Sequence, residues 1–124
     1  MKYKTDKPIY LQIVDYICSQ IIQDKWEINN RTPSVRELSI LLAVNRNTLV
    51  RAFDNIEQLG IVYNKRGIGF FIEEDAKEKI GKLYKEEFFQ ENLPELFEKM
   101  KILKISVEEI AKAYEEYLAK NEKK

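Results

Sequence analysis

Residues 33–72 read PSVRELSILLAVNRNTLVRAFDNIEQLGIVYNKRGIGFFI. This stretch contains two short helix patterns and a glycine-containing hairpin pattern, one after another, with no long linker between them. Ser34 and Glu37 have the spacing of a capping box, in which each side chain accepts a hydrogen bond from the other residue's backbone amide. We therefore expect a helix to begin at about Ser34. Its apolar residues recur at helical spacing and predict one buried stripe, made up of Val35, Leu38, Leu41 and Leu42.

A second helix is predicted to follow the first after a turn at Ala43 and Val44. Asn45 is a favourable N-cap, because its side chain can accept a hydrogen bond from an amide of the first helical turn. Gly60 stands just past the expected end, where glycine most easily adopts a left-handed conformation. The residues expected to point inward are Leu49, Ala52, Phe53, Ile56 and Leu59.

A β-hairpin is predicted next, because residues 61–72 contain two runs of β-branched and aromatic residues around a basic tip, residues 65–67. Upstream, Pro8 precedes a run of isoleucines spaced by four residues, which predicts a longer helix that packs across the other two. The expected fold class is mainly α with a small β-hairpin. Residues 1–74 would form a winged helix-turn-helix domain.

The outer face of the second predicted helix is polar and basic, which suits DNA recognition. Arginine can bond guanine bidentately, asparagine can bond adenine, and Thr48 can reach a phosphate or a thymine methyl group. In a helix-turn-helix, the second helix enters the major groove with its first turn. A basic tip with glycine can lie along a phosphate backbone or in a minor groove. The alternative is an ordinary helix pair whose polar face is only solvated.

Three segments together resemble one known family. They are PIYLQIVDYICSQII from Pro8, TPSVRELSILLAVNRNTLVRAFDNIEQLGIV from Thr32, and KRGIGFFI from Lys65. In sequence and joint spacing they are similar to the DNA-binding domain of the GntR family of bacterial transcription regulators. The short tail that follows is similar to that of the YtrA-like branch.

The resemblance implies a set of DNA-contacting residues. In the family, the arginine of the PSxRxL motif and the first turn of the recognition helix contact bases, and the glycine-bearing wing tip reaches the minor groove. Carried over by motif position and joined to the basic wing tip, the expected DNA-binding residues are Ser34, Arg36, Asn45, Arg46, Asn47, Thr48, Arg51, Lys65, Arg66 and Gly67.

This sequence departs from the family pattern before the PSVR motif. The family commonly has glycines near positions 24 and 29 and a leucine or isoleucine at position 32, where Asp24, Asn29 and Thr32 stand here. Asn29 and Asn30 can supply the turn conformation, so we expect the fold to be retained.

The net charge of zero is unfavourable for a DNA-binding protein at first sight, because contacts to phosphate supply much of the affinity. The distribution of charge is more favourable, since residues 31–66 hold six basic side chains against three acidic ones. We expect a modest affinity that depends on dimerisation.

The composition argues against an enzyme. The chain has no histidine, which is the commonest general base and metal ligand, and Cys18 lies among isoleucines, where a thiol is usually unreactive. We expect no catalytic residue, no metal site and no cofactor. No apolar run approaches the roughly 18 residues of a membrane span, and the N-terminus lacks an apolar signal region. The single cysteine suits a reducing compartment, so a cytoplasmic location is expected.

The tail, residues 75–124, is predicted to be a helical dimerisation domain. Apolar stripes at helical spacing flank a weak break at residues 92–94, and Ser106 with Glu109 forms another capping-box pattern. Such amphipathic segments cannot bury their apolar faces within so short a tail. A second copy is the expected partner, and docking solely onto the winged domain is the alternative. The predicted dimerisation residues are Ile80, Leu83, Tyr84, Phe88, Leu96 and Phe97.

The sequence thus predicts a homodimeric transcription regulator, with repression as its expected role, that binds double-stranded DNA at an inverted repeat. The alternative is a protein-interaction adaptor whose winged helix no longer touches DNA, and the basic recognition turn and wing tip favour the regulator. A small-molecule effector could bind among the tail aromatics Tyr84, Phe88, Phe89 and Phe97, although aromatic residues at helical spacing more often form a core.

Overall fold

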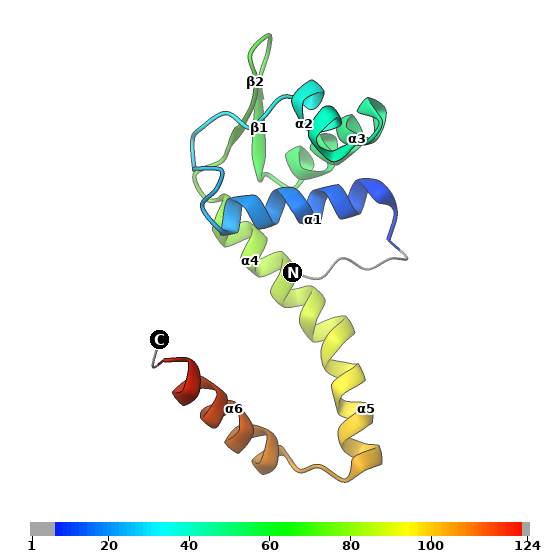
Figure 1. The fold of residues 1–124 in the computed structure, drawn as a ribbon, viewed down its shortest axis with the longest axis vertical. Helices are drawn as coiled ribbons and strands as arrows, with labels where there is room; N and C mark the ends of the chain where they lie inside the picture. The colour runs from blue at the N-terminus through cyan, green and yellow to red at the C-terminus, as the bar shows by residue number, and fades with distance from the viewer. Residues whose placement is uncertain (1–6, 123–124) are drawn as a thin grey trace. The chain divides into compact units, whose positions relative to one another are not determined.

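The computed structural model describes residues 7–122 (Figure 1). Its elements, in chain order, are α1 (Ile9–Ile22), α2 (Val35–Leu42), α3 (Arg46–Gln58), β1 (Val62–Lys65), β2 (Gly69–Ile72), α4 (Ala76–Glu87), the π-helical turn η1 (Phe88–Asn92), α5 (Leu93–Leu103) and α6 (Val107–Asn121). The chain divides into two compact units, Met1–Leu83 and Tyr84–Lys124.

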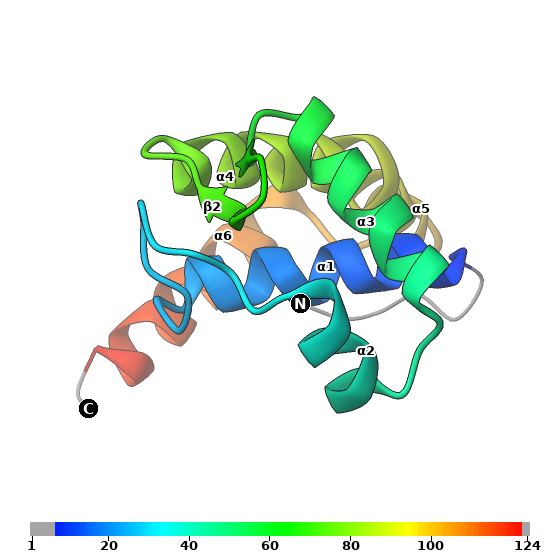
Figure 2. The same ribbon diagram turned by 90° about the horizontal axis from the view of Figure 1, so that it is seen from above.

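The first three helices of the first unit share one apolar core, and α2 joins α3 through a short turn (Figure 2). Ile17 and Ile21 of α1 are fully buried there together with Leu38 of α2. The predicted stripe of α2 is partly wrong, because Leu41 is 68% exposed. This helix has only eight residues, and Leu38 is the one that is buried. Leu59, expected to point inward from α3, is also largely exposed.

Three helix ends form as the sequence predicts. The Ser34 hydroxyl accepts from the Glu37 amide at 3.0 Å, and the Glu37 carboxylate accepts from the Ser34 amide at 3.0 Å, which confirms the capping box. The side-chain oxygen of Asn45 accepts from the Asn47 amide at 2.7 Å and caps α3. Gly60 follows α3 with a φ of 75°.

Non-glycine residues adopt the left-handed conformation at several turns. Asp24 has a φ of 61° and Asn29 a φ of 67°, at the two positions where the family resemblance led us to expect glycine. Aspartate and asparagine are the side chains that tolerate this conformation best, so the departure from glycine is compatible with the fold. Ala43, at the end of α2, has a φ of 54° without that advantage. The conformation costs such a residue about 1–2 kcal/mol.

The wing is the antiparallel hairpin of β1 and β2, in which Lys65 pairs with Gly69. Three residues therefore form the tip, and the Ile68 amide donates to the Lys65 carbonyl at 2.9 Å. The ring of Phe70 stacks on Phe53 of α3 with the two centroids 4.6 Å apart. This stack joins the wing to α3.

The start of α4 belongs to the first unit. Ala76 and Ile80 are buried in its core, with exposures of 0% and 1%. The assignment of Ile80 to a dimer interface was therefore wrong, because its side chain is already covered within its own chain. The unit also extends to Leu83, beyond the boundary predicted after Glu74.

Two lysines tie α4 to the ends of the preceding helices. Lys79 Nζ donates to the carbonyl of Gly60 at 3.1 Å, just past the end of α3. Lys77 forms an ion pair with Asp24, just past the end of α1. Both contacts involve exposed groups, so we assign most of the docking energy of α4 to its buried apolar side chains.

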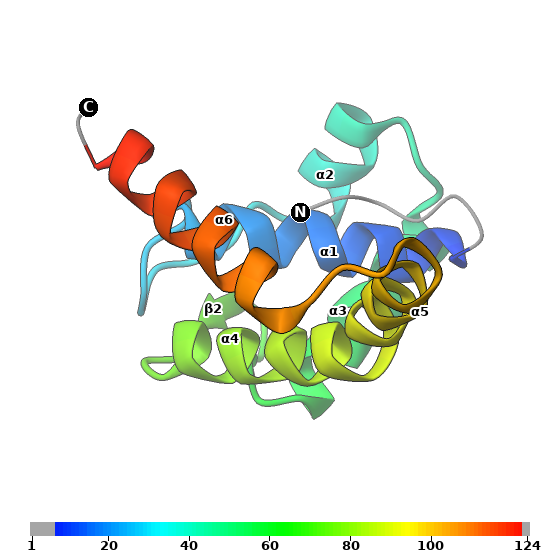
Figure 3. The same ribbon diagram turned by 90° about the horizontal axis from the view of Figure 1, so that it is seen from below.

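The second unit is helical. The helices α4, η1 and α5 follow one another with no residue between them, so the break predicted at residues 92–94 does not occur. Pro94 is tolerated because it lies in the first turn of α5, where its missing amide costs little. A short link joins α5 to α6 (Figure 3). The N-cap of α6 is Ser106, whose hydroxyl accepts from the Glu109 amide at 3.1 Å.

The apolar faces of this unit are uncovered. No side chain of η1, α5 or α6 among the described residues is buried. Large apolar residues such as Phe97 and Ile102 have exposures of 55% and 72%. Within residues 7–122, no helix is both long enough and apolar enough to cross a membrane.

Candidate nucleic-acid interface

The first turn of α3 presents polar side chains to solvent. Arg46 and Asn47 are exposed, and Thr48 is half-buried. The side-chain oxygen of Asn45 is engaged by the Asn47 amide, so its NH₂ group is the part that can donate to DNA. Asp54 is exposed and lies seven residues after Asn47, which places it on the same helix face. Its carboxylate therefore offsets part of the positive charge on this face.

Arg51 is exposed on α3, but its guanidinium has a partner within the chain. The guanidinium carbon lies 4.0 Å from the ring centroid of Tyr10 on α1. This cation–π contact restricts the arginine side chain, so less conformational entropy is lost if it binds a phosphate.

The start of α2 carries Arg36, which is exposed beside the capping box. The backbone amide of Ser34, then its hydroxyl, and the charge of nearby Arg31 hold the pKa of the Glu37 carboxyl below its ordinary value. Glu37 is therefore charged at neutral pH and offsets part of the positive potential next to Arg36. Ser34 acts here as a helix cap, a role that leaves its hydroxyl hydrogen able to donate.

The wing exposes Lys65 at the end of β1 and Arg66 and Gly67 in its tip. Gly67 has a φ of 80°, which glycine adopts without strain. Lys65 Nζ lies 4.3 Å from the ring centroid of Phe71, and that ring stacks on Tyr63 with centroids 5.8 Å apart. The aromatic pair thus supports the lysine at the base of the tip.

None of the ten residues predicted to bind DNA is buried, and all ten lie in the first unit, on α2, α3 and the wing. No motif in the sequence assigns Arg31 to this site. The structure pairs Arg31 with Phe71 of the wing, 40 positions later in the chain. The signal for this contact is weak in the sequence, because it depends on long-range strand pairing.

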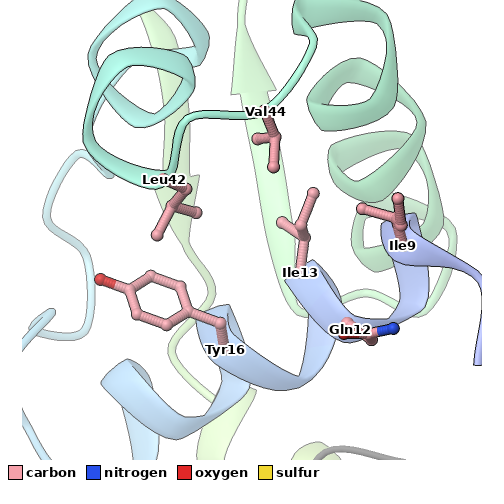
Figure 4. Close-up of a pocket in the computed structure, with 6 residues that line it drawn as sticks. All are labelled: Ile9, Gln12, Ile13, Tyr16, Leu42 and Val44. Atoms are coloured by element: carbon pink, nitrogen blue, oxygen red, sulfur yellow. The ribbon is translucent and has the colours of Figure 1, made fainter. Parts of the chain in front are cut away.

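A shallow apolar pocket of about 220 Å³ lies between α1 and the turn after α2 (Figure 4). Ile9, Ile13 and Tyr16 line it from one side, and Leu42 and Val44 from the other. Ligand sites for drug-sized molecules usually measure about 300–1,000 Å³, and phosphate needs cations that this lining does not provide. The lining of this pocket is thus mainly apolar, in contrast to the basic surface of α2, α3 and the wing.

Comparison with known proteins identifies the family of this domain. Residues 9–72 match the family described as bacterial regulatory proteins, gntR family. The chain is 38% identical over 109 residues to the HTH-type transcriptional regulator YhcF of Bacillus subtilis (strain 168), covering 88% of each protein. It is 34% identical over 74 residues to the HTH-type transcriptional repressor YtrA of the same organism, covering 60% of this chain and 57% of YtrA.

Solved structures support the same family assignment. A transcriptional regulator of the GntR family from Bacteroides thetaiotaomicron superposes with a TM-score of 0.81 at 40% identity, covering 92% of this chain and 99% of that one. The DNA-binding domain of AraR, solved in complex with operator ORR3, superposes with a TM-score of 0.53 at 28% identity, covering 58% of this chain and 87% of that one. The AraR complex is an example of the same kind of domain bound to operator DNA.

Proposed function

This chain belongs to the GntR family of bacterial regulatory proteins and is a DNA-binding transcription regulator, and from that premise we propose that it is a repressor that binds an inverted-repeat operator as a homodimer. The dimer is proposed because of the second unit, where none of the described side chains of η1, α5 and α6 is buried although many are apolar. Repression is proposed from the likeness to YtrA.

A second copy is the partner that best suits these faces. Exposed apolar patches of this extent mark interaction surfaces, and identical amphipathic helices can cover one another in an isologous dimer. Of the residues predicted for dimerisation, Phe88, Leu96 and Phe97 are exposed, while Leu83 and Tyr84 are half-buried. We keep these five for the proposed interface and omit Ile80.

For the DNA side, we propose that Arg36 and the first turn of α3 read bases while the wing contacts the backbone. Arg46 and Asn47 are exposed at the helix start that enters a major groove in this motif. Two such helices related by a dimer two-fold axis require two half-sites in inverted orientation.

Binding-site selection from a random duplex pool with the full chain tests the operator. The expected result is a motif with two inverted half-sites, together with a light-scattering mass of two copies. A motif with a single half-site, or a mass of one copy at micromolar concentration, would contradict the proposal.

Two matched variants test the interface. Phe97→Glu puts a charge on the apolar face of α5 and is expected to give a monomer with weakened operator binding, because each half-site is then bound separately. Lys99→Glu introduces the same residue two positions away, on another face of the helix, and is expected to remain dimeric. Dimerisation that survives Phe97→Glu would place the interface elsewhere.

A further inference from the structure

The segment before α2 is hydrogen-bonded to β2 of the wing. The amide of Asn29 donates to the carbonyl of Ile72 at 2.9 Å, the amide of Ile72 donates to the carbonyl of Asn30 at 3.1 Å, and the amide of Thr32 donates to the carbonyl of Phe70 at 2.9 Å. Arg31 stands between these bonds, opposite Phe71. A single β-bridge thus attaches this segment to β2 and fixes the backbone of Arg31 beside Phe71.

The side chain of Arg31 crosses the wing at Gly69. A Cβ atom placed on Gly69 would lie 3.3 Å from Nε of Arg31, a tight contact, and 3.7 Å from its Cδ, an ordinary van der Waals distance. Gly69 also has a φ of 139°, which disfavours any other residue. Because Gly69 pairs with Lys65, the arginine lies beside the last strand residue before the tip.

Arg31 and Lys65 share one face of the sheet. Residues opposite each other across a ladder point to the same side, so Arg31 lies on the side of Phe71, and Lys65 Nζ sits 4.3 Å from that ring. The other side of the sheet carries Phe70, stacked on Phe53 of α3. The wing therefore has a core face and an outer basic face.

We propose that Arg31 is a DNA backbone contact that completes the basic outer face of the wing with Lys65 and Arg66. Arg31 is exposed and lies near Glu37, but among the described residues it forms no ion pair within 4.0 Å, so its guanidinium can still bond a phosphate. A guanidinium matches the geometry of a phosphate and can bond it bidentately. The positive φ of Gly69 and the nearby arginine side chain both favour glycine at this position. The inference rests on the DNA-binding function of the domain.

The test is the salt dependence of binding to a random-sequence duplex, which reports phosphate contacts without knowledge of the operator. The full chain, Arg31→Gln and Arg31→Lys are compared by fluorescence anisotropy over a series of salt concentrations. Lys120→Gln removes one positive charge from an exposed position in the last turn of α6 and is the matched control.

Arg31→Gln is expected to reduce the slope of log K against log salt by about 0.9 for each bound protomer. For one bound protomer this change corresponds to a roughly five- to tenfold weaker affinity at about 0.1 M salt, because the lost factor varies as that power of the salt concentration, and for a bound dimer the two factors multiply. Arg31→Lys is expected to keep most of the slope, and Lys120→Gln all of it.

An unchanged slope for Arg31→Gln would overturn the inference, and so would a loss in Arg31→Lys as large as that in Arg31→Gln. An equal loss in Lys120→Gln would show that only net charge matters and would also overturn it. Failure of the unaltered chain to bind any duplex would instead contradict the DNA-binding function, so the two failures are distinguishable.

Discussion

Ile80→Ala should destabilise the winged unit by a large amount. The side chain is 1% exposed and lies in the core of the first unit, where removal of a buried isoleucine to alanine costs about 2–5 kcal/mol. A domain of this size has a total stability of roughly 5–15 kcal/mol. At about 4–8 °C for each kcal/mol, a loss of about 3 kcal/mol lowers Tm by roughly 12–24 °C.

The assay is urea unfolding of the full chain, followed by the fluorescence of Trp26. This is the one tryptophan of the sequence, and its ring meets Tyr16 edge to face with centroids 6.3 Å apart, so it reports on the first unit. Ile102→Ala is the matched control, because Ile102 is 72% exposed in α5. Titrations at several protein concentrations separate unfolding from dimer dissociation, since only the latter depends on concentration.

Two results would contradict the burial of Ile80 within its own chain. If Ile80→Ala unfolds at the same urea concentration as the unaltered chain when the protein is dilute, and differs only when it is concentrated, then Ile80 is covered by a second copy. A loss of similar size in Ile80→Ala and Ile102→Ala would equally remove the distinction between the two positions.

Three further outcomes are expected. Arg36→Ala or Arg46→Ala should each cost about 1–3 kcal/mol on the selected operator and much less on random duplex, and equal losses on both duplexes would remove the base-reading assignment. Ala43→Gly should stabilise the fold by about 0.5–1 kcal/mol in urea titrations, because the left-handed strain exceeds the added chain entropy of glycine, and a loss of stability would show that the strain is absent. Glu37 has a lowered pKa in the folded chain, so its contribution is present above the unfolded pKa of about 4.3 and is lost as the pH falls through the folded pKa. Glu37→Gln should therefore lose less stability on acidification than the unaltered chain, and identical acid titrations would show that the carboxylate contributes nothing.

The features that sequence predicted well are local ones. The capping box at Ser34 and Glu37 and the N-cap at Asn45 depend on residues at most three positions apart, so spacing alone determines them. The turn conformation expected at Asn29 is present with a φ of 67°, whereas the positive φ of Asp24 was not predicted.

The features that sequence predicted poorly depend on neighbours distant in the chain. The periodicity of α2 does not predict that Leu41 is exposed, because this depends on how much of the short helix the core covers. The stripe that contains Ile80 looks continuous through the tail, yet its first turn is buried in the preceding unit. Arg31 joins the candidate site through pairing with Phe71, which no local pattern indicates.

The docking of α4 sets where a regulator of this kind can exchange its tail for another module. A tail joined after Leu83 leaves Ala76, Ile80 and the hydrogen bond from Lys79 to Gly60 with the DNA-reading unit. A tail joined after Glu74 must instead supply its own residues to fill those places. Recombination, in evolution or in the design of a hybrid sensor, is thus expected to preserve stability when the crossover lies inside α4 and to lose it when the crossover lies in the loop after the wing.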